Sequence, residues 1–351
     1  MKKILTSLLA VGICLTPLTV MLMAQPTWGQ TQNSQAQDAE RLLQQGIKLT
    51  QQQEHQQAIQ IFQQGLTIAR ELKDQKIEAT ALLGLGRNYD ALGEKQKALD
   101  FYTQALPLYR AVGDRSGVAT TLNNIGAVYD ALGEKQKALD FYNQALPLYR
   151  AVGERTGKAA TLNNIGKVYD DLGEKQKALE FYNQALPLYR AVGDRSDVAT
   201  TLNNIGLVYD ALGEKQKALE FYNQALPLYR AVGDRSGVAT TLNNIGKVYD
   251  ALGERQKALE FYNQALPLYR AVGERSGVAT TLNNIGKVYD ALGEKQKALE
   301  FCNQALPLYR AVGERSGVAR TLNNIGLVYD ALGEKQKALE FYNQALPLYR
   351  A

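Results

Sequence analysis

The side chains that most often perform catalysis are scarce in this sequence. It contains one histidine, His55, and two cysteines, Cys14 and Cys302. A cysteine and a histidine can act as nucleophile and base, but His55 and Cys302 lie far apart in the chain, and neither has other candidate groups around it. No metal-ligand cluster, phosphate-binding glycine loop or nucleophile motif occurs. We therefore expect a protein that is not an enzyme and that holds no cofactor and no metal.

The composition indicates a folded protein that does not bind nucleic acid. With 45% hydrophobic and 21% charged residues, the chain of 351 residues can bury a core. The net charge is +5, but positive and negative residues alternate along the chain. A nucleic-acid site needs cations gathered on one face, so a nucleic-acid partner is not indicated.

The first 29 residues have the pattern of an export signal. Lys2 and Lys3 precede the apolar stretch "ILTSLLAVGICLTPLTVMLMA", and small residues, Thr27 and Gly29, stand before Gln30. We expect cleavage after residue 29, a polar tether over 30–37, and a mature protein in the periplasm or outside the cell. In the alternative, the leader stays uncleaved and anchors the protein in the membrane, since the apolar stretch is near the length of a span.

Residues 38–351 form a repeat array. From Ala119 on, the stretch "ATTLNNIGAVYDALGEKQKALDFYNQALPLYR" returns every 40 residues with few changes, and a weaker copy extends back to Gly46. Within each copy, apolar residues lie at helical spacing in two stripes separated by a glycine such as Gly133. Each copy is therefore expected to be a helical hairpin, and eight hairpins to stack as an all-α solenoid.

The spacing of Leu122, Ile125, Gly126, Tyr129 and Ala138 resembles the tetratricopeptide repeat. The signature glycine recurs at Gly46, Gly86, Gly126, Gly166, Gly206, Gly246, Gly286 and Gly326. The 40-residue period and the wording "TLNNIG" are similar to the kinesin-light-chain type and to cyanobacterial arrays that precede caspase-like CHAT domains. The resemblance implies a right-handed superhelix in which the first helix of each repeat lines a concave groove that binds proteins or peptides.

Three columns of side chains share one face of the predicted first helices. One column is amide: Asn123, Asn163, Asn203, Asn243, Asn283 and Asn323. Another is acidic: Asp90, Asp130, Asp170, Asp210, Asp250, Asp290 and Asp330. The column between them varies from repeat to repeat: Arg87, Ala127, Lys167, Leu207, Lys247, Lys287 and Leu327.

These columns have two interpretations. In the functional one, the amides bind the backbone of an extended peptide while the variable column selects its side chains. In the other, the repeats arose by recent duplication, the exposed column has drifted, and pairs such as Lys167 with Asp170 are simply solvated. For the second asparagine of each pair, such as Asn164, we expect a hydrogen bond to the adjacent repeat.

Taken together, the sequence predicts a non-catalytic, exported scaffold that binds a protein or an extended peptide. The alternative is the sensor half of a CHAT protease system whose catalytic domain is missing or encoded separately. No polar capping helix follows the last repeat, which leaves Leu339, Tyr342, Leu346 and Tyr349 without a neighbour. We expect that end to form a homodimer; in the two alternatives the last helix frays, or the natural array continues beyond residue 351.

Overall fold

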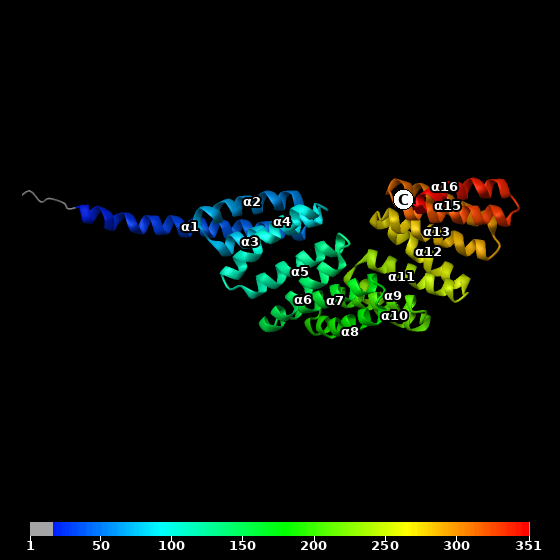
Figure 1. The fold of residues 1–351 in the computed structure, drawn as a ribbon, viewed down its shortest axis with the longest axis horizontal. Helices are drawn as coiled ribbons and strands as arrows, with labels where there is room; N and C mark the ends of the chain where they lie inside the picture. Colours follow the sequence, from blue (N-terminus) through cyan, green and yellow to red (C-terminus); the bar gives the residue numbers. More distant parts are fainter. Residues whose placement is uncertain (1–16, 351) are drawn as a thin grey trace, which may run out of the picture. The chain divides into compact units, whose positions relative to one another are not determined.

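The computed structural model describes the backbone of residues 17–350 and the side chains of 32–349. Every regular element in this part of the chain is an α-helix, and consecutive helices pair into hairpins (Figure 1). The helices are α1 Pro17–Gln51, α2 His55–Leu72, α3 Gln75–Ala91, α4 Lys95–Ala111, α5 Arg115–Ala131, α6 Lys135–Val152, α7 Arg155–Asp171, α8 Lys175–Val192, α9 Arg195–Ala211, α10 Lys215–Val232, α11 Arg235–Ala251, α12 Arg255–Val272, α13 Arg275–Ala291, α14 Lys295–Ala311, α15 Arg315–Ala331 and α16 Lys335–Arg350. The all-α solenoid of eight hairpins is thus confirmed.

The N-terminal part of the chain is only partly described. Residues 1–16 of the predicted leader lie outside the described residues, as do the side chains up to residue 31. Residues 30–37, the predicted tether, belong to α1, and the side chains of 32–35 are exposed. None of the helices in the described part is both long and apolar enough to cross a membrane.

Contacts divide the chain into two compact units, Met1–Leu148 and Tyr149–Ala351. In each unit the odd-numbered helices are the first helices of the repeats and the even-numbered ones are the second helices. Both helices of a hairpin end at turns that the sequence encodes. Gly193 adopts φ of +75° after α8, a left-handed conformation that glycine reaches without strain. Asp194 then caps α9 by accepting a hydrogen bond from the Asp197 backbone N–H.

The signature glycine lets the two helices of a hairpin approach closely. A Cβ at Gly206 would stand 2.6 Å from Cε1 of the Tyr222 ring, so any larger residue would force the helices apart. The ring itself is fully buried, together with Leu202 and Ile205 of α9. Most hairpins therefore contribute an aromatic ring that packs on a glycine, and in the α13–α14 hairpin Cys302 takes the place of the ring against Gly286.

Adjacent repeats contact each other unequally on their two sides. In the unit from Tyr149 onward, the first helices α9, α11, α13 and α15 contact one another in succession. The second helices α10, α12 and α14 contact the following first helix but not one another. The stack is consequently tighter on its first-helix side, and open spaces remain between consecutive second helices.

Candidate binding surface on the first helices

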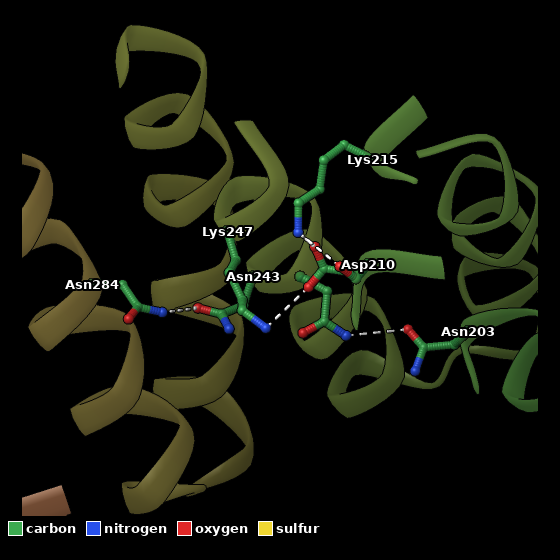
Figure 2. A network of polar contacts seen from close by, with 7 residues as sticks. Asn203, Asp210, Lys215, Asn243, Lys247 and Asn284 are labelled. Atoms are coloured by element: carbon green, nitrogen blue, oxygen red, sulfur yellow. Dashed lines mark hydrogen bonds and ion pairs between the residues drawn. The ribbon is translucent and has the colours of Figure 1, made fainter. Parts of the chain in front are cut away.

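The amide column links successive repeats by hydrogen bonds (Figure 2). Oδ1 of Asn243 accepts hydrogen bonds from Oγ1 of Thr281, at 3.2 Å, and from Nδ2 of Asn284, at 3.4 Å, both in the next repeat. Oδ1 of Asn203 accepts from Asn244 in the same way. The hydrogen bond that we expected from the second asparagine to the adjacent repeat is therefore present at Asn244, Asn284 and Asn324, whereas the buried Nδ2 of Asn124 has no hydrogen-bond partner.

The first asparagines occupy a different environment from the one that the sequence suggested. Asn203, Asn243 and Asn283 are buried, with 3–8% of their surface exposed, because the next first helix covers them. Asn123, Asn163 and Asn323 are half-buried. In the three buried cases the carbonyl oxygen that a peptide would need is already bonded within the array. Here the amide column serves first to join repeats.

The acidic and variable columns form ion pairs between repeats. Lys247 lies 3.0 Å from Asp210 of the preceding repeat, and Lys287 lies 2.9 Å from Asp250 (Figure 2 shows the first pair). The lysines at 247 and 287 thus reach back to another repeat instead of pairing with the aspartate three residues onward. Asp210 also bonds to Lys215. Burial opposes ionisation of Asp210, but these two lysines hold its pKa below the ordinary value.

The variable column decides how much of each aspartate is exposed. The Asp210 and Asp250 side chains, which a lysine covers, are 6% and 12% exposed. The Asp170 and Asp290 side chains, for which the next repeat supplies Leu207 and Leu327, are 25% and 31% exposed. Leucine is shorter and cannot form an ion pair, so those carboxylates keep an open side next to an apolar residue.

The predicted positions in the N-terminal unit have their own surroundings. The exposed Arg87 lines a small cavity of about 110 Å³, together with Ile47, Thr50 and Leu83. Ala127 is half-buried, and Asp130 pairs with Lys135 at 2.6 Å. The cavity combines apolar walls with one cation on the first-helix side of this unit.

Of the reactive side chains that the structure describes, Cys302 is buried and His55 is half-buried. Cys302 is 1% exposed, and burial raises the pKa of its thiol to about 12. His55 Nδ1 contacts Oδ1 of the buried Asn88 at 2.9 Å. Among the described residues, no group of three His, Cys, Asp or Glu side chains could hold a metal ion.

Two functional features escaped the sequence analysis. The lysine that follows the glycine between the two helices of most hairpins, such as Lys215, bonds to the aspartate five residues earlier. Helical spacing gives no sign of a contact made across a turn. The buried threonines, such as Thr241 and Thr281, donate to the amide column. Their invariance next to the asparagines was the one available signal.

Solved structures of several regulators have the same fold. The chain matches the apo quorum sensor NprR from B. thuringiensis with a TM-score of 0.71 and 16% identity, over 95% of both chains. It matches the plasmid pLS20 Rap conjugation regulator, solved with the Phr* peptide, with a TM-score of 0.58 and 15% identity, over 89% of this chain and 95% of that one. It matches BtubC (BKLC) from P. vanneervenii with a TM-score of 0.53 and 22% identity, over 62% of this chain and 89% of that one. No curated protein sequence matches the chain.

The stacked hairpins and their inter-repeat ladders define a helical repeat solenoid. The family model "Tetratricopeptide repeat" matches overlapping segments at 38–111, 108–151, 118–191, 157–231, 197–271, 237–311 and 277–351. The chain belongs to the tetratricopeptide repeat family.

Proposed function

We propose that this protein is a non-catalytic scaffold that binds an extended peptide, or an extended segment of a protein, along its first helices. Structures of the same fold include a Rap regulator solved with the Phr* peptide and a Rap protein complexed with Competence and Sporulation Factor. The 40-residue repeat is similar to that of the kinesin-light-chain type. Such arrays present a ladder of side chains to one ligand.

The observation that carries this proposal is the alternation along the variable column. Where it holds lysine, the aspartate of the preceding repeat is neutralised by an ion pair and covered. Where it holds leucine, at Leu207 and Leu327, a partly open carboxylate stands beside an apolar side chain. Since the surrounding columns hardly change, these two places give the face its chemical pattern.

This pattern favours a ligand with basic and apolar side chains. In Asp170 and Asp290 one carboxylate oxygen, Oδ1, accepts a hydrogen bond from Lys175 and Lys295, respectively. The other side of each carboxylate is open. A lysine or arginine of a peptide can take that side and complete the ion pair that Lys247 makes elsewhere. Leu207 and Leu327 supply the apolar contact next to it.

A peptide library displayed on phage tests the proposal. The wild-type chain should select peptides with lysine or arginine next to an apolar residue. In a Leu207→Lys and Leu327→Lys variant, the new lysines cover both aspartates, and we expect the selection to disappear. The matched control is Val192→Lys with Val312→Lys, which adds the same charge at exposed valines outside this face. Equal losses in both variants, or no selection by the wild type, would contradict the proposal.

We also propose that the scaffold is exported, because Lys2, Lys3 and the apolar stretch after them have the pattern of a signal. N-terminal sequencing of the mature protein should then begin near Gln30. Recovery of Met1 from a membrane fraction would instead identify an anchor. A role as the sensor half of a CHAT protease system would require a partner that carries the catalytic cysteine and histidine.

A further inference from the structure

Open pockets recur on the side of the array where second helices do not touch. The one at the junction of α12, α13 and α14 has a volume of about 480 Å³. Its equivalents at the preceding two junctions and at the following one have about 450, 460 and 530 Å³. All four lie in the unit that begins at Tyr149 and repeat with the period of the sequence. We call them the junction pockets.

Each junction pocket has an apolar floor and a cationic rim. In the α12–α13–α14 pocket the floor is formed by Val278, Leu282 and Leu308, of which the first two are buried. The rim carries Arg270 from the last turn of α12 and Arg275 from the first turn of α13, both exposed. The pocket can therefore receive an apolar side chain while two guanidinium groups stand at its entrance.

The rim arginines differ from the other cations of the α13–α14 repeat, which are already paired. Lys295 bonds to Asp290, and Lys297 bonds to Glu294, both within 2.6 Å. The rim arginines form no ion pair within the described part of the chain: Arg190, Arg195, Arg230, Arg235, Arg270, Arg275, Arg310 and Arg315. In the unit from Tyr149 onward, most of the cations without an ion pair thus lie at these pockets.

The acidic residues at the junctions are engaged elsewhere. Asp234 lines its pocket, but it accepts a hydrogen bond from the Gly237 backbone N–H as the cap of α11. At the next two junctions the cap is a glutamate, and Glu274 and Glu314 accept hydrogen bonds from Ser236 and Ser276 of the preceding repeat. The pockets rimmed by Arg270 and Arg310 consequently have no carboxylate in their lining.

We propose that the junction pockets are a second binding surface, for an acidic segment of a partner protein that inserts leucine-like side chains between carboxylates. Guanidinium groups bind carboxylates in a bidentate geometry, which explains why the rim is arginine rather than lysine. The apolar floor adds a contact that a simple anion cannot make. Because the pockets recur, a segment with several such motifs binds more tightly than one motif alone.

Fluorescence anisotropy with the full chain tests this surface. The probe is a fluorescein-labelled peptide in which leucines alternate with glutamates. Matched peptides carry alanine for leucine or lysine for glutamate. We expect the first peptide to bind, both matched peptides to bind more weakly, and added NaCl to weaken binding because the rim is exposed. Lysine-peptide binding equal to or tighter than that of the glutamate peptide would overturn the proposal.

Two variants separate the rim from general charge. Arg230→Glu, Arg270→Glu and Arg310→Glu together should weaken the glutamate peptide by about tenfold or more, the loss expected for removed charge pairs. The control makes the same change in net charge at Lys217, Lys257 and Lys297, which are exposed and paired. We expect it to keep binding. Circular dichroism must show that both variants are folded. A third variant, with glutamine in place of the same three arginines, removes the positive charge without reversing it.

The outcome is independent of the first-helix face. The Leu207→Lys and Leu327→Lys variant should bind the glutamate peptide as the wild type does. Dodecanoate and inorganic phosphate are added as competitors of the labelled peptide. They show whether the pockets bind a fatty acid or a simple anion instead of an acidic peptide. Binding of dodecanoate or phosphate without binding of the peptide would overturn the proposal, as would equal losses in the arginine and lysine variants.

Discussion

Replacing Asn243 by alanine tests whether the amide column holds repeats together. The side chain is 8% exposed, and its oxygen accepts hydrogen bonds from Thr281 and Asn284. Thr281 also bonds to the Gly277 carbonyl, so the change leaves mainly the Asn284 amide without its partner. Losing the acceptor of a half-buried amide costs about 1–2 kcal/mol.

Helix propensity acts in the opposite direction. Alanine is favoured over asparagine in a helix interior by about 0.6 kcal/mol. The net expectation is a loss of about 0.5–1.5 kcal/mol in the free energy of unfolding. The three buried asparagines accept hydrogen bonds from different donors. Asn203→Ala, Asn243→Ala and Asn283→Ala together should therefore lower the free energy of unfolding by about three times as much.

Urea denaturation followed by far-UV circular dichroism measures the effect. The matched control is Asn263→Ala on the exposed side of α12, where propensity alone should raise stability by about 0.5 kcal/mol. A double-mutant cycle with Asn284→Ala should then show coupling. If Asn243→Ala stabilised the protein as much as Asn263→Ala does, our account of the ladder would be refuted.

Three further predictions concern single sites. Cys302 occupies the position that Tyr262 fills in the preceding repeat. Cys302→Tyr should therefore raise the free energy of unfolding, measured by urea denaturation, by about 1–3 kcal/mol. A lower free energy of unfolding would show that the position is overpacked by tyrosine. Burial, and then the charge of Asp194, raise the pKa of Asp197. The folded state therefore gains stability as pH falls through that pKa, and Asp197→Asn should stabilise the protein at pH 7 but not at pH 3, measured by urea midpoints. Leu346 and Tyr349 are 47% and 59% exposed on α16. Light scattering of residues 1–351 across a hundredfold dilution should therefore show a dimer, and the variant with Leu346→Glu and Tyr349→Glu should not form it. A monomer at every concentration in both proteins would exclude the dimer.

The sequence determined the repeated hairpin almost completely. Apolar spacing and the turn glycines are local signals, and each hairpin obeys them because its geometry depends on residues close together in the chain. The signature glycine was equally readable. Gly206 lies against Tyr222 in the same hairpin, so its role follows from a contact within one repeat.

Contacts between repeats were not readable in the same way. Asn243 with Asn284 and Lys247 with Asp210 join side chains about one repeat apart, and their pairing depends on how successive hairpins stack. Helical spacing alone predicted that Asn243 faces a ligand. Only the tertiary structure shows that the next first helix covers it and that its oxygen is occupied.

The junction pockets depend on the stacking even more strongly. Arg270, Arg275 and Leu308 come from three helices, and the sequence gives each of them an ordinary surface or core role. The pocket exists because the first helices pack closely while the second helices stay apart, a property of the angle between repeats. The sequence therefore determined what each repeat is. The stacking decided which side chains are covered, which are paired, and where an open surface remains for a partner.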